Sequence, residues 1–528
     1  MIPNLYEKVT VLACQGRSWS CSAHGFAPLV AAALAIFCCA WWYWWRSAKF
    51  TEINPPLPPG PRGLPILGNL PFIKQDLHHY FTELSESYGP IFKLQLGTKI
   101  CIVINSPPLV KEVLQDQDAI FANRDLPAAA IVSMFGGLDI AWRPNGPEHN
   151  RLRKLIIREI MSKKSLDTCY ALRRHEIQQM VKDIHWKIGS PVNLGEQISL
   201  TTVKVMISTL WGGSSERSCN LIELRKRLDE FVRLFLAPNV SDIFPVLAPF
   251  DLQGIVSKSK KHMSWFYEIF ESVITSRLKS GDDGKKIVDE INKDFLQKML
   301  ELNQREDDKS YISINEVKAV LLDLMVGGTD TIPTTIEWAM TELLRHPDIM
   351  MKLAEELDTV VEKQNMVEES HLPRLHYLDA VIKETLRLHP VIPLLLPHMP
   401  SKTSIVAGYT IPKHSRVFIN AWAMQRDPRF WDDPLRFQPE RFLKGNNNHR
   451  GNSFQYLPFG SGRRICVGLA LAEKMVAVLL GALVHSFEWE LPRGAKPDVQ
   501  EKFGVVLKKK EALVAIPVAR LSNPKQYK

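Results

Sequence analysis

The sequence of 528 residues has few cysteines, and their spacing is irregular. The eight cysteines form no CxxC pair, and only one of them, Cys466, lies in the last 300 residues. Zinc sites and disulfide frameworks need clustered or repeated cysteines, so neither organises this chain. Cys466 is therefore either a buried small apolar side chain or a lone metal ligand or nucleophile.

The chain also lacks internal repeats, low-complexity tracts and long runs of one charge. Its composition, 45% hydrophobic and 23% charged, is that of a globular protein. The formal net charge is +9, but the basic residues are dispersed, with only short runs such as 258–262 and 507–510. This dispersion argues against a nucleic-acid-binding stripe.

Asp, Glu, Lys and Arg are absent between Arg17 and Arg46. Residues 26–45, FAPLVAAALAIFCCAWWYWW, are mostly apolar, and as a helix they would span about 30 Å, the thickness of a bilayer core. The aromatic cluster at its end suits the interface, and Arg46 and Lys49 favour a cytosolic C-terminal side. A cleaved signal peptide is the alternative, but bulky aromatic residues occupy the place of a small-residue cleavage site.

These features predict four segments. The first is an N-terminal extension, 1–25, and the second is a transmembrane anchor, 26–45. The third, 46–69, is a basic and proline-rich hinge, which proline keeps stiff because it fixes φ and lacks a donor. The remainder, 70–528, is one large catalytic domain.

Patterns within this domain predict a mainly α fold with small β-sheets. Alternating residues around a glycine turn predict a hairpin within 88–107. The segment 313–347 starts with a capping box, Ser313 and Glu316, and stops at a proline, so it predicts a helix of about 30 residues. Short strands are expected near 403–420 and 511–518.

The middle of that long helix carries two adjacent glycines, Gly327 and Gly328, followed by Thr329, Asp330 and Thr331. Each glycine costs about 1 kcal/mol relative to alanine inside a helix. One interpretation is that the glycines open space beside an acid and a hydroxyl that relay protons. The other is a kink for close packing.

The loop FGSGRRICVG, 459–468, surrounds the isolated cysteine with glycines and arginines. Glycines permit a tight turn whose N–H groups point at sulfur, and Arg464 adds positive charge, so both are expected to stabilise a thiolate at Cys466. A thiolate is a strong electron donor to haem iron, where it favours O–O cleavage.

With these motifs the sequence resembles plant microsomal (A-type) cytochrome P450 monooxygenases, from Pro58 to about Pro517. The cysteine signature FxxGxRxCxG is met in 459–468, ExxR at 384–387, PERF at 439–442 and GGTDT at 327–331. The resemblance implies a cytochrome P450 fold behind the transmembrane helix. It also implies haem b as the cofactor, with the axial thiolate, and hence the metal ligand, supplied by Cys466.

The resemblance also implies roles for other residues. Phe459 would pack near the thiolate, and Glu384, Arg387 and Arg441 would form a buried structural network. Asp330 and Thr331 would help to deliver protons during catalysis.

Cations are expected at the haem propionates. Arg153 and Arg464 are the first candidates, and His398 is a further one. His149 stands where the family usually has tryptophan and could donate one hydrogen bond. A second departure is Ile332-Pro333 after the relay, which removes the N–H that would bond the carbonyl of Thr329.

The implied function is to hydroxylate a lipophilic plant metabolite with O₂. Because the chain has no GxGxxG motif, the electrons are expected from NADPH through a separate NADPH-cytochrome P450 reductase. Lys154 and Arg158 lie four apart on one helix face and either dock that acidic partner or are merely solvated. The implied location is the endoplasmic reticulum membrane, single-pass, with the catalytic domain cytosolic.

The apolar segments 128–137, 231–238, 391–397 and 504–506 favour a lipophilic small-molecule substrate. Residues 239–254 resemble a plant subfamily linked to terpenoid and some phenolic substrates, and this resemblance favours a sesqui- or diterpenoid. Hydroxylation of a flavonoid or other phenolic is the nearest alternative. A reductase-independent isomerase or dehydratase of the same fold and a non-catalytic haem-binding protein are the others.

Overall fold

The structure is a computed structural model that describes residues 26–47, 54–133, 135–212, 220–282, 293–305, 311–443, 453–521 and 527. It divides into two units, Met1–Pro56 and Leu57–Lys528. The expected extension, 1–25, and residues 48–53 of the expected hinge lie outside the described residues.

The first unit contains helix α2, Phe26–Ser47, which begins where the apolar run begins. At about 1.5 Å per residue its 22 residues are long enough to cross a bilayer core. Within the part of the chain that the structure describes, one helix, α19, Leu469–Ser486, has the length and hydropathy of a membrane span, and 67% of it is buried; Val30–Trp41 of α2 is a shorter apolar stretch. The membrane anchor at 26–45 remains a prediction.

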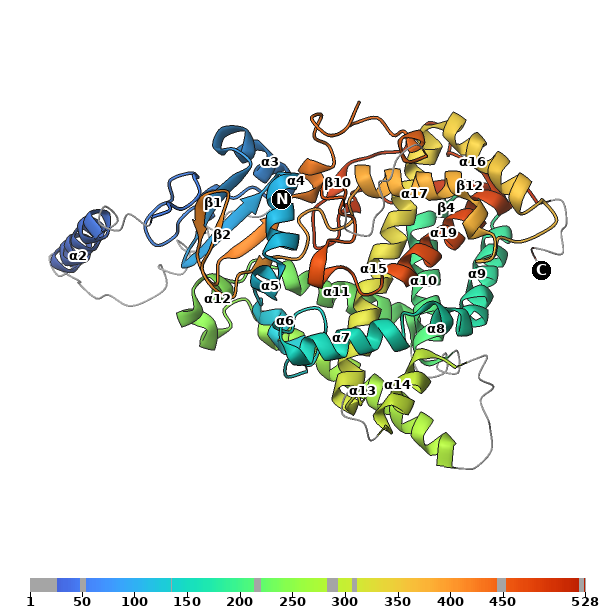
Figure 1. The fold of residues 1–528 in the computed structure, drawn as a ribbon, viewed down its shortest axis with the longest axis horizontal. Coiled ribbons are helices and arrows are strands. Elements are labelled where there is room, and N and C mark those ends of the chain that lie inside the picture. The colour runs from blue at the N-terminus through green and yellow to red at the C-terminus, as the bar shows by residue number, and fades with distance from the viewer. Residues whose placement is uncertain are drawn as a thin grey trace, which may run out of the picture. The chain divides into compact units, whose positions relative to one another are not determined.

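The second unit is mainly helical with small sheets, which confirms the expected fold class (Figure 1). Its α-helices are α3 (Leu77–Tyr88), α4 (Pro107–Lys111), α5 (Asp118–Phe121), α6 (Ala128–Ser133), α7 (Pro147–Glu159), α8 (Lys163–Thr168), α9 (Tyr170–His185), α10 (Leu194–Trp211), α11 (Leu221–Leu236), α12 (Val240–Ile243), α13 (Ile255–Asp282), α14 (Phe295–Asn303), α15 (Ile314–Arg345), α16 (Pro347–Val360), α17 (His376–Leu388), α18 (Ala421–Met424) and α19. Its strands are β1 (Ile91–Leu96), β2 (Lys99–Ile104), β3 (Asn123–Arg124), β4 (Val192–Asn193), β5 (His398–Met399), β6 (Ser404–Val406), β7 (Tyr409–Ile411), β8 (Arg416–Ile419), β9 (Phe487–Glu490), β10 (Glu501–Lys502), β11 (Lys508–Lys509) and β12 (Val514–Ala519).

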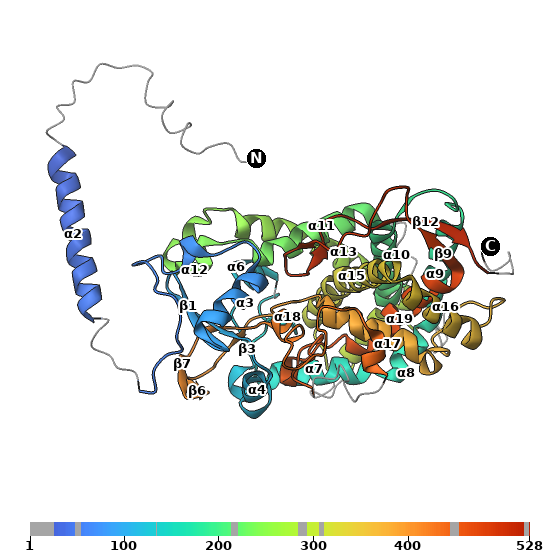
Figure 2. The same ribbon diagram turned by 90° about the horizontal axis from the view of Figure 1, so that it is seen from above.

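Helix α15 runs through the middle of the helical part, as Figures 1 and 2 show. Its first turn is closed by the predicted capping box, in which Ser313 and Glu316 bond each other's backbone N–H groups. Pro333 lies inside the helix and does not end it, because α15 continues to Arg345. α15 packs against α10, α17 and α19. The predicted long helix is therefore confirmed.

The largest sheet has the strand order β1-β2-β8-β5-β3. β1 and β2 form the predicted hairpin, and β2 pairs in parallel with β8. At the far edge β3 pairs with β5, which sets Arg124 directly opposite His398. This pairing matters for the site because it brings together two basic side chains far apart in sequence.

The main hydrophobic core surrounds α15. It is built from apolar side chains of α10, α15, α17 and α19, among which Leu210, Ile336, Val381 and Leu483 are fully buried. α19 follows directly after the cysteine loop, and its sequence is apolar on nearly every face. The core therefore holds both the start of α19 and the middle of α15 in fixed positions.

Candidate active site

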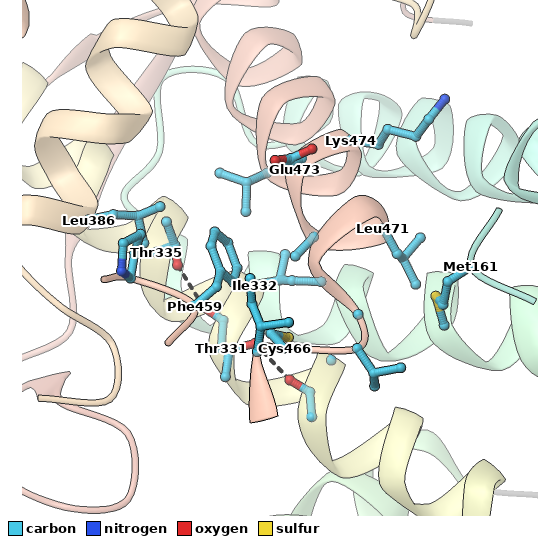
Figure 3. Close-up of a pocket in the computed structure, with 18 of the residues that line it drawn as sticks. Met161, Thr331, Ile332, Thr335, Leu386, Phe459, Cys466, Leu471, Glu473 and Lys474 are labelled. Carbon is cyan, nitrogen blue, oxygen red and sulfur yellow. Dashed lines mark hydrogen bonds between the residues drawn. The ribbon is translucent and has the colours of Figure 1, made fainter. Parts of the chain in front are cut away.

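A cavity of about 1230 Å³ lies between α15 and the cysteine loop, and we name it the central cavity. Ordinary single-ligand pockets hold about 300–1,000 Å³, so this space is large for one ligand. Phe459, Cys466, Thr331 and Ile332 all project into it (Figure 3). The glycines of α15, Gly327 and Gly328, line it too, as expected of residues that open space.

The cysteine loop is shaped by glycine. Gly462 has a positive φ of 65°, and a Cβ there would collide with the carbonyl oxygen of Leu114, so only glycine suits this turn. The backbone N–H of Cys466 donates to the carbonyl of Phe459 at 3.0 Å, which closes the loop. The Cys466 side chain is accessible from the central cavity. The sequence supplies one cysteine at this position, and the loop directs its sulfur toward the central cavity.

The charge environment of the thiol differs from the sequence expectation. Burial raises the pKa of the Cys466 thiol, and the backbone N–H of Gly468 and the nearby Arg153 only partly oppose this rise. Arg464 contributes little because its guanidinium points elsewhere. The protein alone therefore favours the thiol, and a bound metal ion is what would remove its proton.

Three arginines gather near one end of the cavity, and we name Arg124, Arg153 and Arg464 the cation cluster. Burial lowers the pKa of all three. Arg464 and Arg153 lower that of Arg124 further, and Arg153 lowers that of Arg464 further, to about 10. Arg464 donates to the carbonyls of Ala122 at 2.6 Å and Ile140 at 3.1 Å. The cluster is held in place by backbone oxygens rather than by carboxylates.

Arg124 was not singled out from the sequence. Its Nη1 donates to the carbonyl of Leu396 at 2.5 Å, while its buried Nε has no hydrogen-bond partner among the described residues. No local signal marks it, since an arginine next to Asp125 reads as a solvated surface residue. Only the pairing of β3 with β5 buries it.

The two histidines expected at the cofactor behave differently. His398 lines the central cavity, and its Nδ1 donates to the carbonyl of Phe121 at 2.9 Å, which leaves Nε2 for a ligand. Burial and the adjacent Arg124 hold the pKa of His398 well below its usual range.

His149 is placed differently from the expectation. It does not line the cavity, and its Nε2 lies 2.8 Å from Nη1 of Arg464 and accepts a hydrogen bond from it. Burial and Arg464 lower the pKa of His149 to about 4, so the imidazole is neutral. The expectation that His149 lies at a propionate is corrected: it lies outside the cavity lining and bonds Arg464, which makes it a positioning residue for that side chain.

Asp330 and Thr331 sit on different sides of α15. Thr331 lines the cavity and donates its hydroxyl to the carbonyl of Gly327 at 2.7 Å. Asp330 does not line the cavity; it pairs with Lys508, which also lies 3.3 Å from Asp229. Burial raises the pKa of Asp330, and Lys508 opposes that rise.

Glu384, Arg387 and Arg441 form one network. Arg387 donates hydrogen bonds to Glu384 from Nε at 2.7 Å and from Nη2 at 2.8 Å, and both side chains are fully buried. Arg441 adds a bond to Glu384 at 3.0 Å, and the backbone N–H of Gln438 adds another at 2.8 Å. The remaining Arg387 nitrogen donates to the carbonyls of Gln425 and Pro434. The structure thus brings the three residues together beside the cavity helix α17.

A carboxyl pair, Asp139 and Asp323, was also missed from the sequence. Asp323, one turn before Gly327 on α15, accepts the N–H of Ile140 at 2.7 Å, and Asp139 accepts the N–H of Trp142 at 2.8 Å. Burial raises the pKa of both carboxyls, and Asp139 raises that of Asp323 further. A raised pKa favours the protonated form of both carboxyls. Asp323 also fastens the loop that carries Ile140 to α15.

This arrangement fits haem. A sulfur ligand faces the cavity, and the cation cluster, with the unsatisfied Nε of Arg124, offers a site for carboxylates at its edge. Between them the walls are mainly apolar. An apolar macrocycle with an iron centre and two anionic arms matches this donor set, so the site is that of a haem-thiolate protein.

Comparisons with known proteins support the assignment of a haem-thiolate site. The family model described as Cytochrome P450 matches residues 58–516. The chain is 37% identical to a flavonoid 3'-monooxygenase of Crocosmia x crocosmiiflora over 89% of this chain and 94% of that protein. It is 36% identical to carnosic acid synthase of Salvia pomifera over 88% and 93%. A zebra fish cytochrome P450 solved with progesterone aligns with a TM-score of 0.73 and 26% identity, over 84% of this chain and all of that one.

The chain belongs to the cytochrome P450 family. It is a monooxygenase with a haem-thiolate centre, and it uses electrons that come from NADPH through a reductase. The expected cofactors and enzyme class are confirmed. The monooxygenase interpretation therefore replaces two alternatives, a reductase-independent isomerase or dehydratase and a non-catalytic haem-binding protein.

Proposed function

We propose that this enzyme hydroxylates a sesqui- or diterpenoid. The observation that carries the proposal is the aliphatic character of the cavity wall opposite the cysteine loop. Members of that wall are Ile140, Ala141, Met206, Leu324, Ile332, Val391, Ile392, Leu395 and Leu396.

This wall suits a saturated carbon skeleton. Among the described residues that line the cavity, the aromatic rings of Phe459 and Tyr170 belong to the cysteine loop and to α9 and not to this wall. Its polar neighbours on α15 are Asp323, Thr331 and Thr335. A site that selects a polyhydroxylated substrate needs polar partners for its hydroxyls, since an unmatched buried hydroxyl is costly. An apolar wall instead orients its ligand by shape.

The residues of the cysteine side hold the cofactor. Cys466 would supply the thiolate to the iron with Phe459 beside it, and Arg124, Arg153 and Arg464 would bind the propionates, with His398 near them and His149 bonded to Arg464. When bound, haem would activate O₂ with two electrons and two protons, so that one oxygen atom enters a C–H bond of the substrate and the other leaves as water.

The proton path uses α15. Thr331 presents a hydroxyl to the cavity where the two glycines leave room for water. Asp330, held by Lys508 on the other side of the helix, takes protons from outside the cavity. Turning of the Asp330 side chain away from Lys508 passes a proton toward Thr331, in the manner of general acid catalysis.

The axial ligand is tested by spectroscopy. The reduced protein with carbon monoxide is expected to show the Soret band diagnostic of thiolate-bound iron, and Cys466→Ala is expected to lose it. A wild-type band typical of a neutral axial ligand, in folded protein, would contradict the role of Cys466.

The substrate class is tested with microsomes that contain the enzyme, reductase and NADPH. We expect sesqui- or diterpenes to shift the Soret band of the oxidised enzyme and to give hydroxylated products, while flavonoids do neither. Conversion of a flavonoid without conversion of any terpenoid would reverse the assignment.

The redox partner is proposed to be NADPH-cytochrome P450 reductase. Lys154 and Arg158 are exposed on α7, the helix that also carries Arg153 beside the thiol. They therefore offer positive charge near the cysteine side of the site. Charge reversal of both should raise the reductase concentration needed for half-maximal turnover, and salt should have the same effect on the wild type.

The enzyme is proposed to be a single-pass protein of the endoplasmic reticulum membrane with a cytosolic catalytic unit. α2 supports this because apolar side chains cover its described surface, for example Phe37 and Trp41. Within the second unit, Ile66 and Val246 are 70% and 85% exposed and belong to segments that flank the β1–β2 turn. Alkaline carbonate should leave the wild type in the membrane pellet and release a chain without residues 1–47.

A further inference from the structure

A cluster of two histidines and a glutamate lies outside the central cavity. His78 and His79 are neighbours in the first turn of α3, and Glu501 begins β10. Nε2 of His78 lies 3.0 Å from Oε2 of Glu501, and Nε2 of His79 lies 3.4 Å from the same oxygen. Each of the three residues offers one potential ligand atom, and these three atoms all lie within 4.8 Å of one another.

We propose that His78, His79 and Glu501 bind a divalent transition-metal ion, best matched by Zn²⁺, which fastens β10 to α3. Two imidazoles and one carboxylate are a known three-ligand set for zinc, with a fourth position left for water. Ligands at about 2.0–2.1 Å in a tetrahedron lie roughly 3.4 Å apart, close to both measured separations. Nitrogen ligands favour zinc over magnesium or calcium.

The surroundings prepare these three groups for a metal. The second oxygen of Glu501, Oε1, accepts from Nε1 of Trp422 at 3.3 Å and lies 3.5 Å from Nη2 of Arg426. These contacts orient the carboxylate and leave Oε2 toward the histidines, as outer partners of metal ligands do. The fully buried His78 is packed between Trp422 and Phe503, at ring distances of 5.1 and 5.2 Å.

The protonation states agree with ligation. Burial lowers the pKa of His78, and the two histidines and Arg426 hold the pKa of Glu501 below its usual range. A neutral imidazole and an ionised carboxylate are the forms that bind metal. In the metal-free protein Nε2 of His78 donates to Oε2 of Glu501, so ligation through Nε2 moves that proton to Nδ1, which is buried without a partner among the described residues. The exposed His79 gives the ion a route in from solvent.

Residues 501–507 would connect a metal at this site to the wall of the central cavity. From Glu501 the chain passes Phe503, whose ring stacks on His78, to Leu507, whose N–H donates to the carbonyl of Val391 at 2.8 Å. Val391 lines the central cavity. Fastening β10 to α3 therefore restrains residues 501–507, which adjoin the substrate side of the enzyme.

The test is a zinc titration of the full-length, haem-loaded enzyme, prepared without a polyhistidine tag, treated with a chelator and desalted. Isothermal titration calorimetry is expected to show one saturable site in the wild type. His79→Ala, an exposed position, should weaken that site by at least about tenfold while leaving the thiolate-type carbon monoxide spectrum intact. His175→Ala, which removes an exposed histidine on α9, is the matched control and should bind as the wild type does.

A second readout distinguishes zinc binding at this site from non-specific zinc binding. Zinc should slow amide hydrogen exchange in residues 498–507 of the wild type and of His175→Ala, and should have no such effect in His79→Ala. An unchanged affinity in His79→Ala, or binding that is weak, multiple and equal in all three proteins, would overturn the proposal. Magnesium chloride at the same concentration should neither bind nor compete.

Discussion

Loss of the Glu384 charge is expected to prevent assembly of the haem-loaded enzyme. Glu384 accepts four bonds, two from Arg387, one from Arg441 and one from the backbone of Gln438. Glu384→Gln keeps the size of the side chain but replaces one oxygen with a donor that faces guanidinium donors. Removing one partner from a buried ion pair costs about 3–5 kcal/mol, because it leaves the other charge uncompensated.

That cost is a large part of the roughly 5–15 kcal/mol that stabilises a typical folded protein. It lowers the ratio of folded to unfolded protein by about 100- to 4,000-fold. The expected result is a lower urea midpoint and little carbon monoxide-binding haem per milligram of protein.

The matched control is Glu440→Gln. Glu440 lies two residues after Gln438 and accepts from Lys352 at 2.7 Å and Tyr377 at 2.9 Å, but it is partly exposed. Exposed ion pairs contribute little, so this variant should retain its haem and its midpoint. If Glu384→Gln behaved like Glu440→Gln in both assays, the reasoning about the buried network would be wrong.

Three further predictions concern protons on α15. The pKa values of Asp139 and Asp323 are raised in the folded state, so their contribution to stability is complete below about pH 4 and is lost as pH rises through the folded pKa values. Asp323→Asn, which still accepts the Ile140 N–H, should flatten that pH dependence in urea unfolding; an unchanged slope would exclude the carboxyl pair as its source. Lys508→Met removes the cation that lowers the pKa of Asp330. Because Asp330 must be protonated to act as a general acid, the basic limb of the pH–rate profile should move to higher pH, and an unmoved limb would deny Asp330 a proton role. Pro333→Thr restores an N–H toward the carbonyl of Thr329, and we expect it to change the fraction of NADPH oxidation that ends as hydrogen peroxide; equal peroxide release in both proteins would show that the proline does not matter to coupling.

Local patterns in the sequence were enough for the elements that frame the site. The capping box and the following proline predicted 313–347, and the structure has Ile314–Arg345, because a helix start and stop depend on neighbouring residues. The glycine turn predicted the β1–β2 hairpin for the same reason. The cysteine loop could be interpreted because its glycines, thiol and arginine are contiguous.

Tertiary partners could not be found in this way. Arg124 becomes a cavity residue only when β3 meets β5, about 270 residues later in the chain, and Lys508 pairs with Asp330 from 178 residues further along the chain. His149 shows the opposite error. Its place in a motif suggested contact with the cofactor, whereas packing turned it toward Arg464. Motif position gives the neighbourhood of a side chain, and the direction in which it points depends on contacts that the local sequence does not contain.

The cation cluster has a consequence for the life of the newly made chain. Before haem arrives, Arg124, Arg153 and Arg464 lie near one another and form no ion pair with a carboxylate among the described residues, so their mutual repulsion opposes folding of the apoprotein. The two anionic arms of the cofactor relieve it, which makes haem a ligand that selects the folded state. The cellular abundance of this enzyme should then follow haem supply, with chains that find no haem going to proteolysis.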